Sequence, residues 1–347
     1  MYPWPPVAAG EAAPQWNGTA FVAAGKKARV LCYHAAQSGW CDELTLMHEA
    51  DAGQDHYMDR ASRRAALAAL ALVLARPGAV ILDVGCSSGF FLRELQRRAP
   101  GAFAIGADFL VEPLERLGRT LPGVPLLQFD LTRAPLPDRQ LDGFVALNVL
   151  EHIEDHALAM AHLARMLKPG GIGVIEVPAG QHLYDFYDAH LLHFRRYALT
   201  DLCTMARAAG LEVLKASHLG CFLYPAFSFM KKRNQRLSRT LAAAEQKNLV
   251  QRQIRLAKSN PVFHACMFLE RALGRFLNFP WGIRCWLKVR RPLQEASPAT
   301  GGPEQARQHS ARRDHAPAAA TLINFPPPPA AALPWVDGPR PLVAPRS

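Results

Sequence analysis

The sequence predicts an α/β fold in which a doubly wound, mostly parallel sheet of seven strands has helices on both faces. The first observation is segment 79–95, where an apolar run leads to Asp83, a turn of small residues over 85–89 and a helical pattern from Phe90. Such a run, turn and helix are the opening of a nucleotide-binding βαβ unit. The second observation is a series of four apolar runs that each end in a polar residue. The carboxyl ends of parallel strands share the edge at which open α/β sheets bind ligands, so this pattern predicts a site there.

The other elements follow in chain order. Seven segments are predicted strands: 80–82, 102–107, 126–129, 144–147, 172–177, 212–219 and 283–289. Asp59 is expected to cap a helix that continues through Leu74, and a further helix is expected over 202–209. Segment 167–171 is interpreted as the end of a helix, because lysine in the last turn and glycines beyond it are typical of helix C-termini.

The glycine turn indicates which nucleotide the site takes. It has the form Gly-x-x-x-Gly and lacks the full Gly-x-Gly-x-x-Gly of dinucleotide enzymes. Asp83 beside the helix N-terminus repels a pyrophosphate, whereas it suits a ligand with an ammonium and a sulfonium group, such as S-adenosylmethionine (SAM). Asp108 ends the second strand 25 residues after Asp83, where a carboxylate holds a ribose diol.

With these motifs in order, roughly residues 58–291 resemble the class I, Rossmann-like SAM-dependent methyltransferases, most strongly from Val80 to Val177. Segment 81–89 (Ile-Leu-Asp-Val-Gly-Cys-Ser-Ser-Gly) is similar to the glycine motif of that family, with Ser87 where a glycine is usual. The resemblance implies that Asp108 binds the ribose and that Asp130 faces the adenine. The cofactor residues implied in this way are Asp83, Gly85, Cys86, Gly89, Asp108, Phe109, Asp130, Leu131, Asn148 and Val149.

Histidines near the carboxyl edge are the candidates for catalysis. Methyl transfer from SAM is a direct displacement, so the protein mainly aligns the reacting groups. A hydroxyl acceptor also needs a general base, for which histidine is the commonest choice. We expect His152 or His193 in this role, and segment 187–197 is expected to cover the acceptor as a lid. The candidate acceptor-binding residues are His190, Arg195, Arg196 and Tyr197.

Each of these residues also has a structural interpretation. His152 belongs to a Leu-Glu-His turn, where a histidine can simply hold the loop. Arg195 and Arg196 either clamp a phosphate or carboxylate of the acceptor, or they pair with a nearby aspartate: Asp185, Asp188 or Asp201. No trio of His, Asp and Glu has metal-ligand spacing in the sequence, so no metal is expected.

The composition fits one large domain with flanking segments. The chain has 347 residues, of which 50% are hydrophobic. We expect an N-terminal segment over 1–57, the methyltransferase domain over 58–291 and a disordered tail rich in proline and alanine over 292–347. No apolar run reaches the roughly 18 to 20 residues of a spanning helix, and no signal peptide is visible at the N-terminus. The seven cysteines are widely spaced, which suggests reduced thiols in a cytoplasmic protein.

The net charge of +11 is concentrated in one stretch. Residues 231–258 contain nine bases and one acid, within a helical insertion expected at about 228–278. Apolar runs flank this stretch, which suggests a peripheral membrane contact through 219–277, at the inner face of the membrane. A solvated helical hairpin is the structural alternative. Nucleic acid is a third partner, which we do not favour although a basic patch is also the usual footprint for RNA.

These observations predict a SAM-dependent methyltransferase (EC 2.1.1.-) acting on a small-molecule or a lipid- or sugar-linked acceptor, by O-, N- or C-methylation. Residues 148–151 (Asn-Val-Leu-Glu) replace the Asn/Asp-Pro-Pro-aromatic motif of enzymes that methylate base amines, which argues against that chemistry. Two alternatives stay open. One is an RNA or protein methyltransferase that docks through 231–258, and the other is a non-enzymatic SAM-binding partner subunit.

Overall fold

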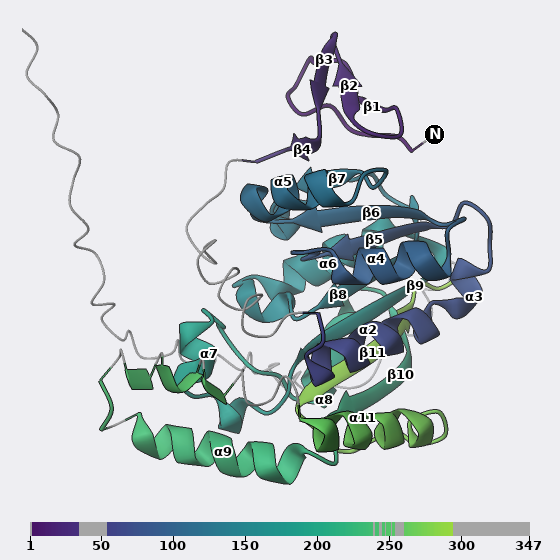
Figure 1. Cartoon of the computed structure of the whole chain (residues 1–347). Helices are drawn as coiled ribbons and strands as arrows, with labels where there is room; N and C mark the ends of the chain where they lie inside the picture. Colours follow the sequence, from purple (N-terminus) through teal and green to yellow (C-terminus); the bar gives the residue numbers. More distant parts are fainter. Residues whose placement is uncertain are drawn as a thin grey trace, which may run out of the picture. The chain divides into compact units, whose positions relative to one another are not determined.

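The computed structural model describes residues 2–34, 54–238, 240–242, 245–246, 248–250, 252–253 and 260–293. Its centre is a sheet of eight strands in the order β10-β11-β9-β8-β5-β6-β7-β4 (Figure 1). The strands are β4 (Val30–Cys32), β5 (Val80–Val84), β6 (Phe103–Asp108), β7 (Leu126–Gln128), β8 (Leu141–Leu147), β9 (Leu167–Pro178), β10 (Glu212–Leu219) and β11 (Arg284–Arg290). In this sheet β11 runs antiparallel to β9 and β10, and the other pairs are parallel. The predicted fold class is confirmed, while the predicted tail lies outside the described residues from position 294 onward.

The sheet has one strand more than the seven predicted, and this strand comes from the N-terminal segment. β4 is three residues long and pairs in parallel with β7, beginning with Val30 opposite Leu126. The sequence did not indicate this strand, because its only partner in the sheet, β7, is distant in the chain. The preceding residues form a small antiparallel sheet of β1 (Gln15–Trp16), β2 (Phe21–Ala23) and β3 (Lys26–Ala28). Trp4 packs edge-on against Phe21, with ring centroids 5.1 Å apart, and both belong to the main core.

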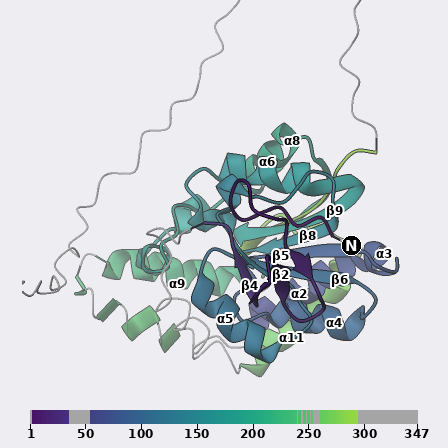
Figure 2. The ribbon, with the colours of Figure 1, turned by 90° about the horizontal axis from the view of Figure 1, so that it is seen from above.

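Helices cover both faces of the sheet, with α6 and α8 on one side and α4 and α5 on the other (Figure 2). The helices are α2 (Tyr57–Ala69), α3 (Ala71–Leu74), α4 (Phe90–Arg98), α5 (Val111–Thr120), α6 (His156–Met166), α7 (Phe186–His190), α8 (Leu199–Ala208), α9 (Tyr224–Leu237) and α11 (Pro261–Leu273). None of the helices in the described ranges is long and apolar enough to cross a membrane.

Two predicted helix boundaries need correction. The helix expected from Asp59 begins at Tyr57 and is divided at Leu70 into α2 and α3. Asp59 therefore lies in the first turn rather than at the cap, and its carboxylate pairs with Arg284 at 2.6 Å. Segment 167–171 does follow the end of α6, but it already belongs to β9.

The strand order explains where the site forms. The chain leaves β5 toward β6 and β7 on one side, and later returns to β8 and β9 on the other. The border between β5 and β8 is thus the point where the strand order reverses, and open α/β sheets bind ligands at the carboxyl edge beside this point.

Candidate cofactor and acceptor site

The backbone of the turn between β5 and α4 allows a ligand to approach it closely. Gly85 and Gly89 have φ angles of +69° and +71°, in the left-handed region that favours glycine. A Cβ atom on Gly85 would lie 2.6 Å from Cγ2 of Val149, so a larger residue does not fit there. Gly89 is also the N-cap of α4, whose first amides have no partner within the helix. Ser87, which replaces the usual glycine, adopts φ of 44° and keeps the turn tight.

Two carboxylates flank this turn. Asp83, near the end of β5, is buried; this burial and the negative charge of Asp108 raise the pKa of the Asp83 carboxyl well above its usual range. Asp108 ends β6 and accepts hydrogen bonds from the N–H groups of Ser87 at 2.9 Å and Leu110 at 3.1 Å. A cationic group beside Asp83 would favour its ionised form. The pair therefore favours a positively charged ligand over a pyrophosphate.

The next two strand ends hold Asp130 and Asn148. Asp130 caps a 3₁₀ turn over Leu131–Arg133, where its Oδ1 accepts from the backbone N–H of Thr132 at 2.9 Å and from the Thr132 hydroxyl at 2.7 Å. Partial burial acts to raise the pKa of Asp130, but these hydrogen bonds and Arg133 lower it overall. Asn148 has a left-handed φ of 55°, and its N–H donates to the carbonyl of Glu176 at 2.8 Å. Both residues are thus anchored at the ligand-binding edge.

A cavity of 1210 Å³ opens at this edge. This exceeds the roughly 300–1,000 Å³ of one small-molecule site, so a cofactor and an acceptor can lie side by side. Nine of the ten residues expected at the cofactor line the cavity, and Gly89 is the exception. Three of the expected catalytic and acceptor residues also line it: His152, His193 and Arg196. The other three are not among its lining residues: His190, Arg195 and Tyr197.

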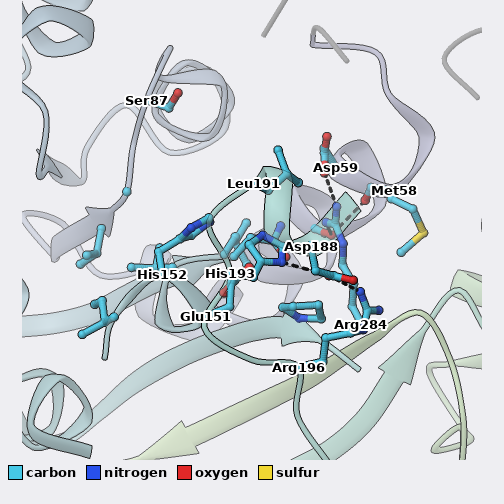
Figure 3. Close-up of a pocket in the computed structure, with 18 of the residues that line it drawn as sticks. Met58, Asp59, Ser87, Glu151, His152, Asp188, Leu191, His193, Arg196 and Arg284 are labelled. Atoms are coloured by element: carbon cyan, nitrogen blue, oxygen red, sulfur yellow. Dashed lines mark hydrogen bonds and ion pairs between the residues drawn. The ribbon is translucent and has the colours of Figure 1, made fainter. Parts of the chain in front are cut away.

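His193 is held in one orientation by a buried carboxylate. Its Nδ1 lies 3.1 Å from Oδ1 of Asp188, and the two side chains point toward one another in Figure 3. The backbone is tied as well, because the Tyr184 hydroxyl donates to the His193 carbonyl at 2.7 Å. Burial lowers the pKa of His193, with Arg196 and Lys231 acting in the same direction and Asp188 opposing them. The imidazole is therefore neutral at pH 7. Since a carboxylate only accepts hydrogen bonds, the proton lies on Nδ1 and leaves Nε2 as an acceptor.

Asp188 is the centre of a buried charge cluster that the sequence did not reveal. Besides His193, its carboxylate binds Nη1 of Arg196 at 2.7 Å and Nζ of Lys231 at 2.6 Å. Lys231 also pairs with Asp185 at 2.7 Å and is itself buried. Burial alone would raise the pKa of Asp188, but His193 and the two cations hold it far below its usual range. Lys231 is thus not part of the solvated basic stretch in which the sequence placed it.

Glu151 lies fully buried beside the two histidines (Figure 3). Neither of its carboxyl oxygens has a hydrogen-bond partner among the described residues, and burial raises its pKa to about 8.

The rings of His152 and His193 meet edge to face with centroids 4.7 Å apart. One donor atom from each of Glu151, His152 and His193 lies within 4.8 Å of the others, so this trio is the place where the described chain can hold a divalent cation. The sequence gave no sign of it because His193 is distant in the chain.

Replacing Glu151 by glutamine should change how stability depends on pH. The folded-state pKa of about 8 lies above the ordinary value of 4.5, so protonation stabilises the fold below pH 4.5 and this contribution is lost as pH rises toward 8. Glutamine mimics the neutral carboxyl, so the variant should keep its stability as pH rises. For such a pKa shift, the wild type should lose about 5 kcal/mol of unfolding free energy over the same range. Urea unfolding of Glu151→Gln and wild type across this range measures it.

The matched control for this experiment is Glu154→Gln, because Glu154 is exposed. It should follow the wild-type profile. Parallel profiles for wild type and Glu151→Gln would contradict a protonated Glu151. Repeating the series with EDTA and with added Mg²⁺ or Zn²⁺ tests the cation directly, since a bound cation would ionise Glu151 and flatten the wild-type profile.

Arg195 and Tyr197 hold the loop instead of facing the cavity. Arg195 donates to the carbonyls of Ile153 and Glu154, each at 2.9 Å. The Tyr197 hydroxyl donates to the carbonyl of Leu150 at 3.0 Å. These contacts fasten the segment after α7 to the segment after β8. The sequence left two roles open for Arg196: clamping the acceptor or pairing with a nearby aspartate. The structure shows that Arg196 pairs with Asp188.

A second network reaches the cavity through three of its four residues: Asp59, Ser62 and Arg284. Arg284 of β11 binds Glu176 of β9 at 2.7 Å and Asp59 of α2 at 2.6 Å, and it donates to the Ser62 hydroxyl at 3.0 Å. Sequence reasoning named Asp59 only as a helix cap and did not name the other three. The available signal was a glutamate within the apolar strand of 172–177, because a buried carboxylate requires a charged or hydrogen-bonding partner.

Comparisons with known proteins identify the class of domain. Residues 55–216 match the family model of a methyltransferase domain. The trans-aconitate 2-methyltransferase of Azoarcus sp. (strain BH72) is 36% identical over 115 residues, which cover 33% of this chain and 45% of that protein. The demethylmenaquinone methyltransferase of Deinococcus radiodurans is 33% identical over 127 residues, 35% of this chain and 51% of that one. The ubiquinone biosynthesis O-methyltransferase of Aeromonas salmonicida is 32% identical over 155 residues, 39% of this chain and 64% of that one.

The chain spans about half the length of the curated relatives it matches. Among solved structures, a Galdieria sulphuraria protein described as a sarcosine dimethylglycine methyltransferase superposes with a TM-score of 0.52 at 15% identity, over 73% of this chain and 100% of that one. This likeness concerns the fold alone. The matched domain and the order of the motifs place residues 55–216 among the class I SAM-dependent methyltransferases. SAM is the methyl donor of that family.

Proposed function

We propose that this chain transfers a methyl group from SAM to a small-molecule acceptor that lies between the cofactor and His193. The observation that carries the proposal is the single cavity that joins the glycine turn, Asp83 and Asp108 to the buried pair of His193 and Asp188. Its volume of 1210 Å³ has room for both ligands. SAM supplies an electrophilic methyl group on its sulfonium.

The cofactor half of the cavity has the donor set that SAM requires. Asp83 and Asp108 offer carboxylates to the ammonium group and to the ribose diol, and Asp130 with the backbone of Leu131 would face the adenine. Asn148 and Val149 would border the methionyl part, and the turn from Gly85 through Cys86 to Gly89 would pass beneath it. Phe109, which follows Asp108, would border the ribose. These assignments are those that the resemblance to the family implies, and all of these residues except Gly89 line the cavity.

The acceptor half supplies a base and an orienting group. Neutral His193 has its proton on Nδ1, toward Asp188, so Nε2 can take the proton of an acceptor hydroxyl. Asp188 acts as a positioning residue that fixes this tautomer. His152, whose ring packs against His193, borders the same space and is the second candidate base.

The lining of the acceptor half favours an acceptor with an apolar part. Leu223, Phe227 and Met230, from α9 and the residue before it, face the cavity together with Phe263 of α11. We infer a small molecule that is either free or linked to a lipid or sugar carrier. Two of the relatives are named for quinone metabolites and one for an aconitate, which supports small-molecule acceptors.

Titration of the wild type and of Asp108→Ala with SAM in a calorimeter tests the proposal. The substitution removes hydrogen bonds from a charged acceptor to the ribose, which should weaken SAM binding by about 1.5–3 kcal/mol, or roughly 10- to 150-fold. Asp201→Ala is the control, because Asp201 is exposed on α8 and does not line the cavity. It should bind SAM like wild type.

Three outcomes would redirect the proposal. Equal SAM affinity in Asp108→Ala and wild type would show that Asp108 is not the ribose ligand. Tight SAM binding with no transfer of a labelled methyl group to any small-molecule or lipid-linked acceptor in a screen would favour a partner subunit. Methylation of RNA or protein, weakening steeply with salt, would favour docking through 231–258.

A further inference from the structure

The helix α11 turns an apolar face outward. Phe268 is 64% exposed, and Phe276, just beyond the helix, is 87% exposed. The apolar residues at 262, 265, 269 and 272 recur at intervals of three and four, so they lie on one side of the helix. A surface helix normally shows the reverse arrangement, with its polar side in water. This side of α11 therefore requires an apolar or amphipathic partner.

The opposite side of α11 is anchored, so the helix cannot rotate to hide these residues. Glu270 is buried and its carboxylate accepts from the N–H of Gly220 at 2.7 Å and of Phe222 at 3.3 Å. Phe263 packs against Tyr57 of α2, with ring centroids 5.0 Å apart. The outward apolar side is thus a consequence of the fold.

The helix α9 adds to the same surface. In Figure 1, α9 and α11 both lie along the border of the molecule beyond β10. Phe229 of α9 is 72% exposed, and the exposed side of this helix then continues with Lys232, Arg233 and Arg236. Trp281 lies half exposed in the segment that follows α11. We define the α9–α11 face by its six main apolar residues: Phe229, Val262, Phe268, Leu269, Phe276 and Trp281.

The charge around this face is positive. Among the described residues of segment 222–282, Lys232, Arg233, Arg236 and Arg252 are exposed bases, and Glu245 is an exposed acid. Glu270 is buried, whereas Arg271 and Arg275 are exposed on and just after α11. Aromatic and aliphatic side chains bordered by cations match the interface of an anionic bilayer, where the apolar groups enter the headgroup region and the cations approach phosphates. A second copy of the chain would instead bring two basic faces together.

We propose that the α9–α11 face docks on the surface of an anionic phospholipid membrane. The inner sides of the same helices line the cavity through Phe227, Met230 and Phe263. Docking would therefore place the acceptor half of the cavity beside the lipid, where a lipid-linked acceptor reaches His193 without leaving the membrane. The delivery of the acceptor rests on the proposed function, whereas the docking itself does not.

Sedimentation of the full chain with vesicles tests the docking. Phosphatidylcholine vesicles that contain phosphatidylglycerol should bind the wild type, and binding should weaken with salt because exposed charges are screened. Pure phosphatidylcholine should bind far less. The variant Phe268→Glu/Phe276→Glu removes two phenyl groups from the interface, which should reduce binding at least about tenfold for each. Both side chains are exposed, so the variant should keep the melting temperature of wild type.

The control is Leu72→Glu, which introduces the same charge at a residue of α3 that is 84% exposed and lies outside the face. It should bind vesicles like wild type. Absence of wild-type binding to anionic vesicles, or equal binding by the double variant, would overturn the proposal. So would a dimer in lipid-free solution that the double variant dissociates, because the face would then belong to a second copy. SAM titration of the same variants separates the two proposals: loss of vesicle binding with intact SAM affinity concerns the docking alone.

Discussion

Replacing His193 by alanine should lower the rate of methyl transfer about 10²- to 10⁴-fold and leave the affinity for SAM near that of wild type. The substitution removes the acceptor Nε2 from the acceptor half of the cavity, while the cofactor half lies around the glycine turn. Turnover should therefore fall through kcat, with the SAM dissociation constant as the internal reference. The measurement is single-turnover transfer of a labelled methyl group to the acceptor found by screening.

Two further histidine variants sharpen this experiment. His182→Ala is the control, because His182 does not line the cavity. His152→Ala distinguishes the two candidate bases, and a larger rate loss there than in His193→Ala would transfer the role of base to His152. Equal turnover in His193→Ala and wild type would remove His193 from the chemistry.

Replacing Asp188 by alanine should destabilise the fold by about 3–5 kcal/mol, because removal of one partner from a buried charge cluster leaves the other charges uncompensated. Arg196 and Lys231 bind Asp188 at 2.7 and 2.6 Å and are both buried. Urea unfolding measures the loss. The double variant Asp188→Ala/Lys231→Met should recover part of it, since methionine removes one unpaired cation and keeps an apolar stem.

The control for Asp188 is the exposed pair of Arg290 and Glu212, which are 2.7 Å apart. Glu212→Ala should cost about 0–1 kcal/mol, as is typical of surface ion pairs. A loss of the same small size in Asp188→Ala would contradict the stabilising role of the cluster, and recovery by Lys231→Met would then not be seen.

The sequence was sufficient for the features that local patterns encode. The apolar runs predicted the other seven strands of the sheet, and the turn from Gly85 to Gly89 with Asp83 and Asp108 predicted the ligand-binding edge. These features are readable because strand runs, left-handed turns and strand-end carboxylates depend on residues adjacent in the chain. The short β4 was not predicted, because its place in the sheet depends on pairing with β7, which is distant in the chain.

What the sequence determined by itself is thus the α/β sheet, the family and the residues expected around SAM. Only the tertiary structure decided the partners of the buried charges and the exposure of the apolar ones. Lys231 is 43 residues from Asp188, and Arg284 is 225 residues from Asp59, so no local pattern relates them. For Phe268, the sequence showed only an apolar run beside the basic stretch, and its exposure of 64% depends on how α11 packs. The physical reason is that burial is a property of what packs against a side chain, and this is known only when distant segments meet.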